Sequence, residues 1–198
     1  MRFLIFPALA FASLQCWAQQ DSPLVLNASY ALQTDSNLFR LPSAADTQAL
    51  VGRSSAAEQI GATTLGLRFA TTQSLQKFEF NASIVDYHYQ NFDYLNFVAT
   101  NYDAAWRWSL TPQFTGSITS QRVETLNSFA DYQGFRTRNQ RTDTTHSFDG
   151  VYALQGPWRL LGGVSQTERS NEQALVAGGD YRFYSVDCLS GMHALLVY

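Results

Sequence analysis

The chain has 198 residues and a formal net charge of −3; aromatic residues make up 14% of it and charged residues 15%. This length suits one ordinary domain or one small barrel, and the slight negative charge gives no electrostatic footprint for nucleic acid. The charged share is low, since about 25% is usual. The mean hydropathy of −0.18 is that of a soluble protein, but an alternating barrel would also give this average, because half of each strand is polar.

The first residues have the pattern of a secretory signal peptide. A positive end at Arg2 is followed by an apolar run and by a small-x-small sequence that ends at Ala18. We therefore predict a leader over residues 1–18. The apolar run is too short for a spanning helix of roughly 20 residues, so any membrane insertion would have to use β-strands. Cleavage would remove Cys16 and leave Cys188, for which we expect no role.

The first half of the mature chain predicts three strands. Alternation indicates a strand over residues 24–33, and a long polar loop follows it over 43–57. A second strand is expected over 59–70, and a short turn then leads to the third. In the third strand the alternation slips near Val85, where Tyr87 takes over the apolar set. We expect either a β-bulge there or the exit of the strand from a bilayer.

The clearest alternation lies in the predicted fourth strand, residues 98–110. One parity carries Tyr102, Trp106 and Trp108. The other carries Asp103 and Arg107. A period of two indicates an extended strand with one apolar face and one polar face. The same pattern predicts four later strands, over residues 114–123, 141–154, 158–165 and 173–184.

The predicted connections alternate in length. Short turns at 71–74, 111–113 and 155–157 alternate with long loops, as in outer-membrane barrels. The sequence therefore predicts an all-β fold over residues 19–185: an antiparallel up-and-down transmembrane β-barrel with about eight strands, either complete or part of a larger barrel. Aromatic residues beside the short turns would form the membrane-interface girdle: Phe69, Phe78, Trp106, Trp108, Phe114, Tyr152 and Trp158. A soluble β-sandwich also alternates, but it gives no reason for tryptophans to gather beside short turns.

The polar parity supplies the candidate site. We predict that it lines a lumen, and its charged and amide members are Arg68, Lys77, Glu79, Asn81, Asn101, Asp103, Arg107, Arg141, Asp143, Asp149 and Arg159. In a barrel of about eight strands, side chains just fill the interior. There the set would be a ladder of salt bridges and hydrogen bonds, which the sequence favours for this chain as it stands. In a wider barrel it would line a path for a sugar chain or small solutes.

The sequence gives no reason to expect an enzyme, a cofactor or a metal site. Asp143 and Asp149 share one face of a strand, but six positions put them roughly 20 Å apart, too far for a glycosidase pair. No nucleophile elbow and no phosphate-binding glycine loop occurs. The histidines are scattered without metal-ligand spacing: His88, His146 and His193.

Two segments carry a resemblance to a known family. Residues Asp86 to Gln113 and Thr34 to Pro42 resemble the EpsL-like outer-membrane β-barrel proteins of exosortase/PEP-CTERM-associated exopolysaccharide biosynthesis clusters. The resemblance extends over about Leu24 to Tyr184. It implies a Gram-negative protein of the cell outer membrane that serves exopolysaccharide biosynthesis or export. The implied partners are outer-membrane lipid, a polysaccharide and other proteins of the export cluster, and no catalytic residues are implied.

Members of that family are longer, so this chain resembles an N-terminal portion. The tail over residues 186–198 loses the expected turn-and-strand pattern, and we expect it to be irregular, from a truncation or a frame shift. Tyr198 could instead end a last strand. We predict a non-enzymatic barrel that acts as a pore or scaffold. The alternative is a soluble periplasmic β-sandwich that binds saccharide; a polysaccharide lyase or hydrolase has no motif behind it.

Overall fold

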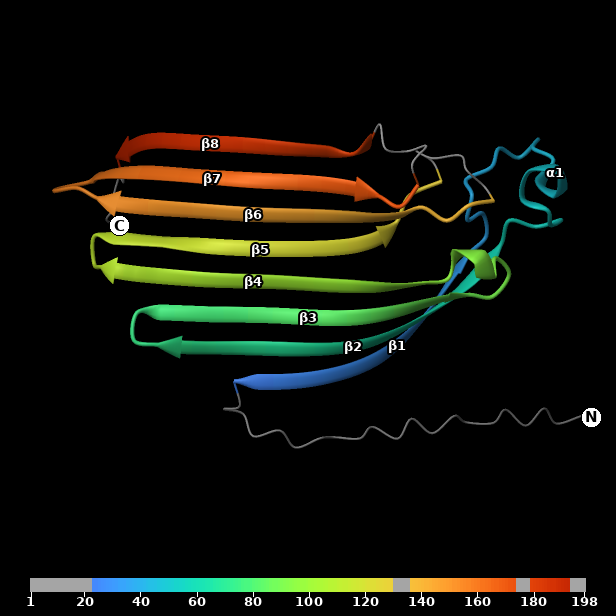
Figure 1. Ribbon diagram of the computed structural model, residues 1–198, viewed down its shortest axis with the longest axis horizontal. Helices are drawn as coiled ribbons and strands as arrows, with labels where there is room; N and C mark the ends of the chain where they lie inside the picture. Colours follow the sequence, from blue (N-terminus) through green and yellow to red (C-terminus); the bar gives the residue numbers. More distant parts are fainter. Residues whose placement is uncertain (1–22, 130–135, 174–178, 193–198) are drawn as a thin grey trace, which may run out of the picture.

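The computed structural model describes residues 23–129, 136–173 and 179–192. The predicted leader, residues 1–18, and the end of the tail, residues 193–198, lie outside these ranges, as does His193. The described residues form an all-β fold in which eight strands pair antiparallel, each with its neighbours in sequence, in one sheet of order β1 to β8 (Figure 1). The strands are β1 Leu24–Asp35, β2 Glu58–Gln73, β3 Gln76–Tyr89, β4 Phe97–Thr111, β5 Phe114–Leu126, β6 Gln140–Ala153, β7 Trp158–Asn171 and β8 Tyr181–Met192.

The connections alternate in length as predicted. At one end of the sheet, the turn end, β2 and β3 are joined through Ser74, where φ is +55°, and β6 and β7 through Gly156, where φ is +78°. The turn between β4 and β5 is held by the Thr111 hydroxyl oxygen, which accepts from the Phe114 N–H at 3.0 Å. The connections at the other end, the loop end, are longer and contain the short helix α1 Thr47–Val51 and the 3-10 turn η1 Asp93–Leu95.

The register assigns every strand residue to one of two faces, because directly paired residues of antiparallel strands lie on the same side of a sheet. The apolar face is the side of the sheet that carries this row of directly paired residues on β3 to β8: Phe78, Trp106, Ile118, Phe148, Val164 and Val186. The polar face is the opposite side, which carries this row of directly paired residues on β2 to β7: Arg68, Asn81, Asp103, Gln121, Thr145 and Thr167. The alternation read from the sequence is thus maintained across the sheet.

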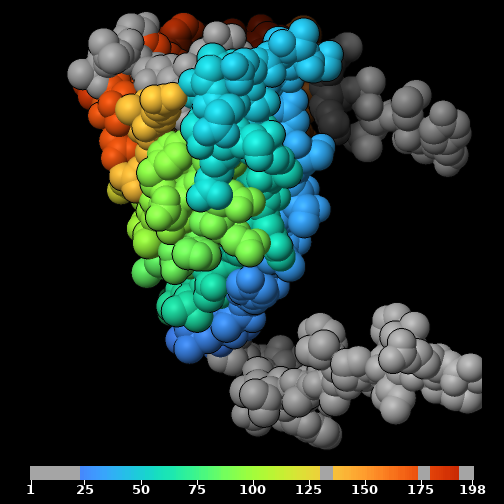
Figure 2. Space-filling model, turned by 90° about the vertical axis from the view of Figure 1, so that its right-hand side faces the viewer, coloured from blue at the N-terminus to red at the C-terminus, as the bar shows by residue number. Residues whose placement is uncertain are grey.

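The long connections at the loop end fold back onto the polar face. We call this layer the cap; it comprises residues 36–57, 90–96 and 127–129. Its fully buried side chains are Phe39, Phe92 and Leu95, and they belong to one core with Ala99 of β4. In Figure 2 the cap segment 36–57, in cyan, lies between the blue flank of β1 and the orange flank of the later strands. The polar face is therefore the one that the cap covers.

The parity slip in β3 has a different cause from the predicted bulge. β3 pairs with β2 and β4 without a break from Gln76 to Tyr87, so the expected bulge near Val85 is wrong. Val85 and Tyr89 lie on the polar face and are buried beneath the cap. These two positions are apolar because the cap shields them from solvent. The register shift that the sheet does show lies between Ser109 and Thr111 at the turn end.

The last two strands run further along the chain than the sequence indicated. β7 continues to Asn171, through most of the predicted loop 167–172, and β8 begins at Tyr181. Residues 186–192, expected to be an irregular tail, therefore belong to a strand. The error arose because the loop-end half of β7 is polar on both faces, which reads as a loop when only residues of one strand are considered.

The described strands form one sheet and not the two packed sheets of a sandwich. Within the described ranges, β1 pairs with β2 alone and β8 with β7 alone, so the sheet is not closed into a barrel. No helix among the described residues is long and apolar enough to cross a membrane.

Candidate functional site

The polar face collects every residue that the sequence predicted for a lumen. The ladders place all of them on the same side of the sheet, although they come from five different strands. They are Arg68, Lys77, Glu79, Asn81, Asn101, Asp103, Arg107, Arg141, Asp143, Asp149 and Arg159.

Near the turn end, these side chains are joined in ion pairs and hydrogen bonds. The Lys77 ammonium lies 3.0 Å from the Glu79 carboxylate, which also pairs with the Arg107 guanidinium. Asn81 donates to Asp103 across the next row. The Ser117 hydroxyl donates to Asp149 at 2.5 Å. The neighbouring row has paired hydroxyls on β5 to β8, among them Ser165 and Ser185 at 2.8 Å.

A second charged cluster lies nearer the loop end. Asp143 of β6 is 3.0 Å from Arg141 Nε and 2.7 Å from Arg169 Nε. Sequence reasoning missed Arg169, because it placed residues 167–172 in a loop. The spacing of ten residues between Arg159 and Arg169 keeps them on one face of a strand and was the signal that could have found it.

Not every candidate has a partner. Among the described residues, the Arg68 and Arg159 guanidinium groups make no ion pair or side-chain hydrogen bond that would hold them in place, and both are exposed. Asn101 has a structural role instead. Its Oδ1 accepts from the Glu124 N–H at 2.8 Å, just beyond the point where the direct pairing of β4 and β5 ends.

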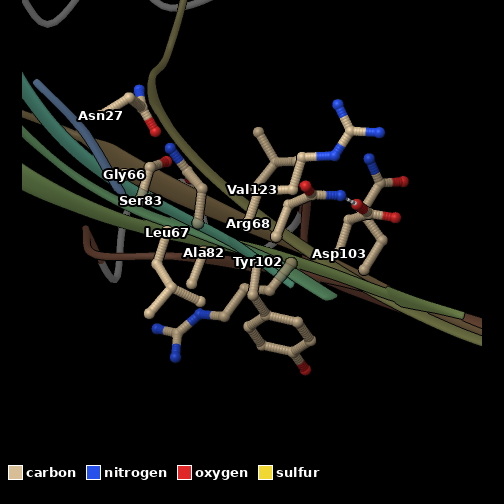
Figure 3. Close-up of a pocket in the computed structure, with 13 residues that line it drawn as sticks. Asn27, Gly66, Leu67, Arg68, Ala82, Ser83, Tyr102, Asp103 and Val123 are labelled. Carbon is tan, nitrogen blue, oxygen red and sulfur yellow. Dashed lines mark hydrogen bonds between the residues drawn. The ribbon is translucent and has the colours of Figure 1, made fainter. Parts of the chain in front are cut away.

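Arg68 lines an open groove of about 360 Å³ on the polar face. Its lining includes a set of amide side chains from four strands, Asn27, Asn81, Asn101 and Gln121. Figure 3 shows Asn27 and Asp103 on one side of the sheet and Leu67, Ala82 and Tyr102 on the other. Gly66 makes room for the amide of Asn27, since a Cβ there would lie 2.4 Å from Asn27 Oδ1. Such groups can donate to and accept from sugar hydroxyls.

The aromatic residues predicted for a girdle all lie on the apolar face, toward the turn end. Phe78 and Trp106 stack with ring centroids 5.9 Å apart, and Phe114 contacts Tyr152 at 6.2 Å. Trp108 differs from the others because it is only 7% exposed. It lies against the sheet and packs on Phe114 at 4.9 Å.

The two faces exchange their character along β3, in the sense that each face carries apolar side chains in one half of the strand and polar side chains in the other. On β3, Ile84 of the apolar face is 53% exposed, whereas Val85 of the polar face, one residue further, is 8% exposed. Toward the loop end the apolar face instead carries polar groups such as Asp86 and His88. On β3, exposed apolar side chains of the apolar face thus give way to polar ones toward the loop end, while the polar face there becomes an apolar core under the cap. The change is not uniform across the sheet, since Leu32 of β1 and Val98 of β4 are exposed on the apolar face near the loop end.

Hydrogen bonds that involve the carboxylates of Glu58 and Glu172 hold the cap in place. Glu58, itself buried, accepts from the backbone N–H groups of Asn91 at 2.9 Å and Phe92 at 2.8 Å. Arg138 donates to Glu172 at 3.0 Å and to the Asn96 carbonyl at 2.6 Å. Its hydrogen bond to Glu172 lowers the pKa of that carboxyl below the ordinary value and raises the pKa of Arg138. Desolvation by burial raises the pKa of Tyr94, in the cap, to about 12.

The described residues contain no group of three or more histidine, cysteine, aspartate or glutamate side chains that could hold a metal ion. His88 and His146 make hydrogen bonds with single neighbours, at 3.2 Å from Asn96 and 2.9 Å from Ser120. The arrangement as a whole offers hydrogen-bond donors and acceptors along an open groove on the polar face.

The chain has no significant match among family models, curated proteins or solved structures.

Proposed function

We propose that this protein is an outer-membrane β-barrel protein, that its eight strands form at least part of the barrel wall, and that it serves exopolysaccharide export as a pore or scaffold. The apolar face would contact lipid and the polar face would line the lumen. The turn end would lie in the periplasm, and the cap would lie inside the barrel toward the cell exterior.

The observation that carries this proposal is the exchange of character between the two faces. A protein that is surrounded by water rarely exposes a large contiguous apolar patch, yet the apolar face exposes a continuous row of large side chains: Phe78, Trp106, Ile118, Phe148 and Val164. Lipid around this part of the sheet would account for the exposed row, and water around the loop end would account for Asp86 and His88 on the same face. The position where the faces exchange then marks where the strands leave the bilayer.

Strand length and aromatic placement support the same arrangement. The strands have 12 to 16 residues, whereas about 9–11 tilted residues cross a bilayer. The remaining residues of each strand can extend into water and carry the cap. The exposed Trp106 and Trp158 lie near the turn end, where a girdle at the periplasmic interface belongs.

The role in exopolysaccharide export rests on the resemblance of Thr34 to Pro42 and Asp86 to Gln113 to EpsL-like proteins, and on the chemistry of the groove. Amide side chains, and an Arg68 that has no ion pair with any described residue, suit the hydroxyl and acidic groups of a sugar chain. As a pore the barrel would pass the chain along this surface. As a scaffold it would hold other export proteins without conducting.

Fractionation of cells tests the location, and conductance separates the two roles. The protein should sediment with outer-membrane markers and resist extraction by salt and urea. Purified protein in planar bilayers should conduct if it is a pore, and the absence of conductance would leave the scaffold role. Recovery as a soluble periplasmic protein would contradict the proposal and favour the alternative, a saccharide-binding protein that uses the same groove.

A further inference from the structure

The two edges of the sheet carry its most exposed large apolar side chains. Among the described residues these are Val186 at 78% and Leu189 at 66% on β8, and Leu26 at 73% and Tyr30 at 67% on β1. Both edge strands have 12 residues, and within the described ranges each pairs on one side only. Unpaired strand edges cannot face lipid, because their N–H and C=O groups would lack partners.

Closure of one copy on itself would conflict with the cap. In barrels of about eight strands the interior is just wide enough for side chains. Here the polar face supports a further layer with its own buried core around Phe39, Phe92 and Leu95. That layer needs a wider lumen than one copy can enclose.

We propose that a second copy of this chain closes the wall, with β8 of each copy paired to β1 of the other. The inference rests on the proposed membrane location. β1 and β8 run in opposite directions, so they can form an antiparallel ladder between copies. A twofold axis then repeats the same seam twice and leaves no edge. Twice the eight described strands gives about 16, the size at which porins contain a channel.

The two strands match in the pattern of their faces. Aligned end to end and antiparallel, they place Val186 opposite Tyr30 and Cys188 opposite Ala28 on the lipid side, while Ser190 lies opposite Leu26 near the turn end. On the other face the same alignment places Asp187 opposite Ser29. A shift by one residue would bring apolar against polar faces, whereas a shift by two keeps the faces matched.

Cys188, which is exposed on β8, provides a direct probe of the seam. The test uses the full chain in outer membranes with Cys16 replaced by serine. A28C, L26C and Y30C each add one thiol on the apolar face of β1, at the end-to-end register and at the two registers shifted by two residues. S29C adds a thiol on the opposite face and is the matched control, and A28C combined with C188S shows dependence on the native cysteine.

After mild oxidation, we expect one of the three apolar-face variants to shift from monomer to covalent dimer on a non-reducing gel, while S29C and the C188S control stay monomeric. An internally cross-linked monomer would show that one copy closes on itself and would overturn the proposal. So would the absence of cross-linking in all three variants while the protein sediments with the outer membrane. Loss of the protein from the membrane fraction would instead contradict the proposed location, so the two failures are distinguishable.

Discussion

The indole of Trp108 lies flat over Gly116, its direct partner on β5, and a Cβ on that glycine would lie 2.3 Å from Trp108 Cζ2. The same Cβ would lie 2.3 Å from the carbonyl oxygen of Asp149. The ring reaches on toward Gly150, whose added Cβ would be 4.0 Å from Trp108 Cη2. Gly116 of β5 and Gly150 of β6 therefore leave room for this tryptophan to pack against the sheet. This explains why Trp108 is buried while Trp106 is exposed.

Replacing Gly116 by alanine should destabilise the sheet by about 1–3 kcal/mol, the usual cost of overpacking. The rigid ring and the backbone carbonyl cannot both move away. Urea unfolding in lipid vesicles, followed by tryptophan fluorescence, would measure the loss. G162A is the matched control, because it lies on the same face and its Cβ would meet only the Asp187 carbonyl, at 3.9 Å. Equal stabilities of G116A and G162A would contradict the packing described for Trp108.

Charge on the apolar face should be costly only near the turn end. Ile84→Arg places a guanidinium where lipid is proposed, just before the faces exchange, so its cost should lie between the about 2–4 kcal/mol of the bilayer midplane and the about 0–1 kcal/mol of the interface in outer-membrane barrels. His88→Arg, on the same strand and face, lies beyond the position where the faces exchange and should be nearly neutral. The free energy of unfolding in vesicles and the amount of folded protein in the outer membrane both report this difference. If Ile84→Arg were as stable as His88→Arg, water would surround both positions.

The Arg138–Glu172 contact should make the loop end sensitive to acid. The pKa of Glu172 is lowered in the folded protein, first by its hydrogen bond from Arg138. Its stabilisation is therefore present above the ordinary glutamate pKa of about 4.3 and is lost as the pH falls through the lower folded value. The Gln140 amide, which donates to Glu172 at 3.2 Å, is the reporter.

Hydrogen exchange, corrected for the intrinsic rate, should show protection of Gln140 that falls as the pH drops below about 4.3. In E172Q the protection should be lower at neutral pH and should no longer fall with acid. A protection factor that has the same pH dependence in E172Q and the unmodified protein would rule out this role of Glu172.

Glu58→Gln should loosen the cap, because it removes the charge from hydrogen bonds that hold the backbone of Asn91 and Phe92. Disturbing a buried, hydrogen-bonded polar group costs about 1–3 kcal/mol. Trypsin cleavage at Arg53, whose guanidinium lies 5.6 Å from the Phe92 ring centroid, should then accelerate by about tenfold or more. E168Q changes an exposed strand carboxylate and should leave the cleavage rate unchanged. An unchanged rate in E58Q would show that Glu58 does not hold the cap.

The sequence predicts those features of the structure that depend on neighbouring residues of the chain. It does not predict those that depend on contacts between residues far apart in the chain. Alternation within each strand correctly placed Arg107 and Trp106 on opposite faces, because the period of two is a property of the backbone. It could not reveal the cap, since contacts such as Phe39 with Phe92, at 4.7 Å, join residues far apart in the chain. It also could not show that the slip at Val85 comes without a bulge, because the loop that covers Val85 is distant in the chain.

Among the candidate site residues, sequence parity also correctly grouped the charged and amide side chains on one face. Parity could not show which of these side chains form ion pairs or hydrogen bonds. Glu79 and Asp143 each pair with two cations, whereas Arg68 has neither ion pair nor side-chain hydrogen bond among the described residues. Those pairings depend on the register between strands, which is not encoded in the alternation of one strand.

The most direct test of the account is a cysteine scan along β3 in intact outer membranes, with Cys16 and Cys188 both replaced by serine. A membrane-impermeant maleimide should label D86C and H88C rapidly in unsealed membranes. F80C and I84C, on the same face nearer the turn end, should stay unlabelled until the protein is unfolded, because lipid covers them. Labelling of F80C and I84C at the rate of D86C would show that water reaches the whole face and would contradict the membrane location.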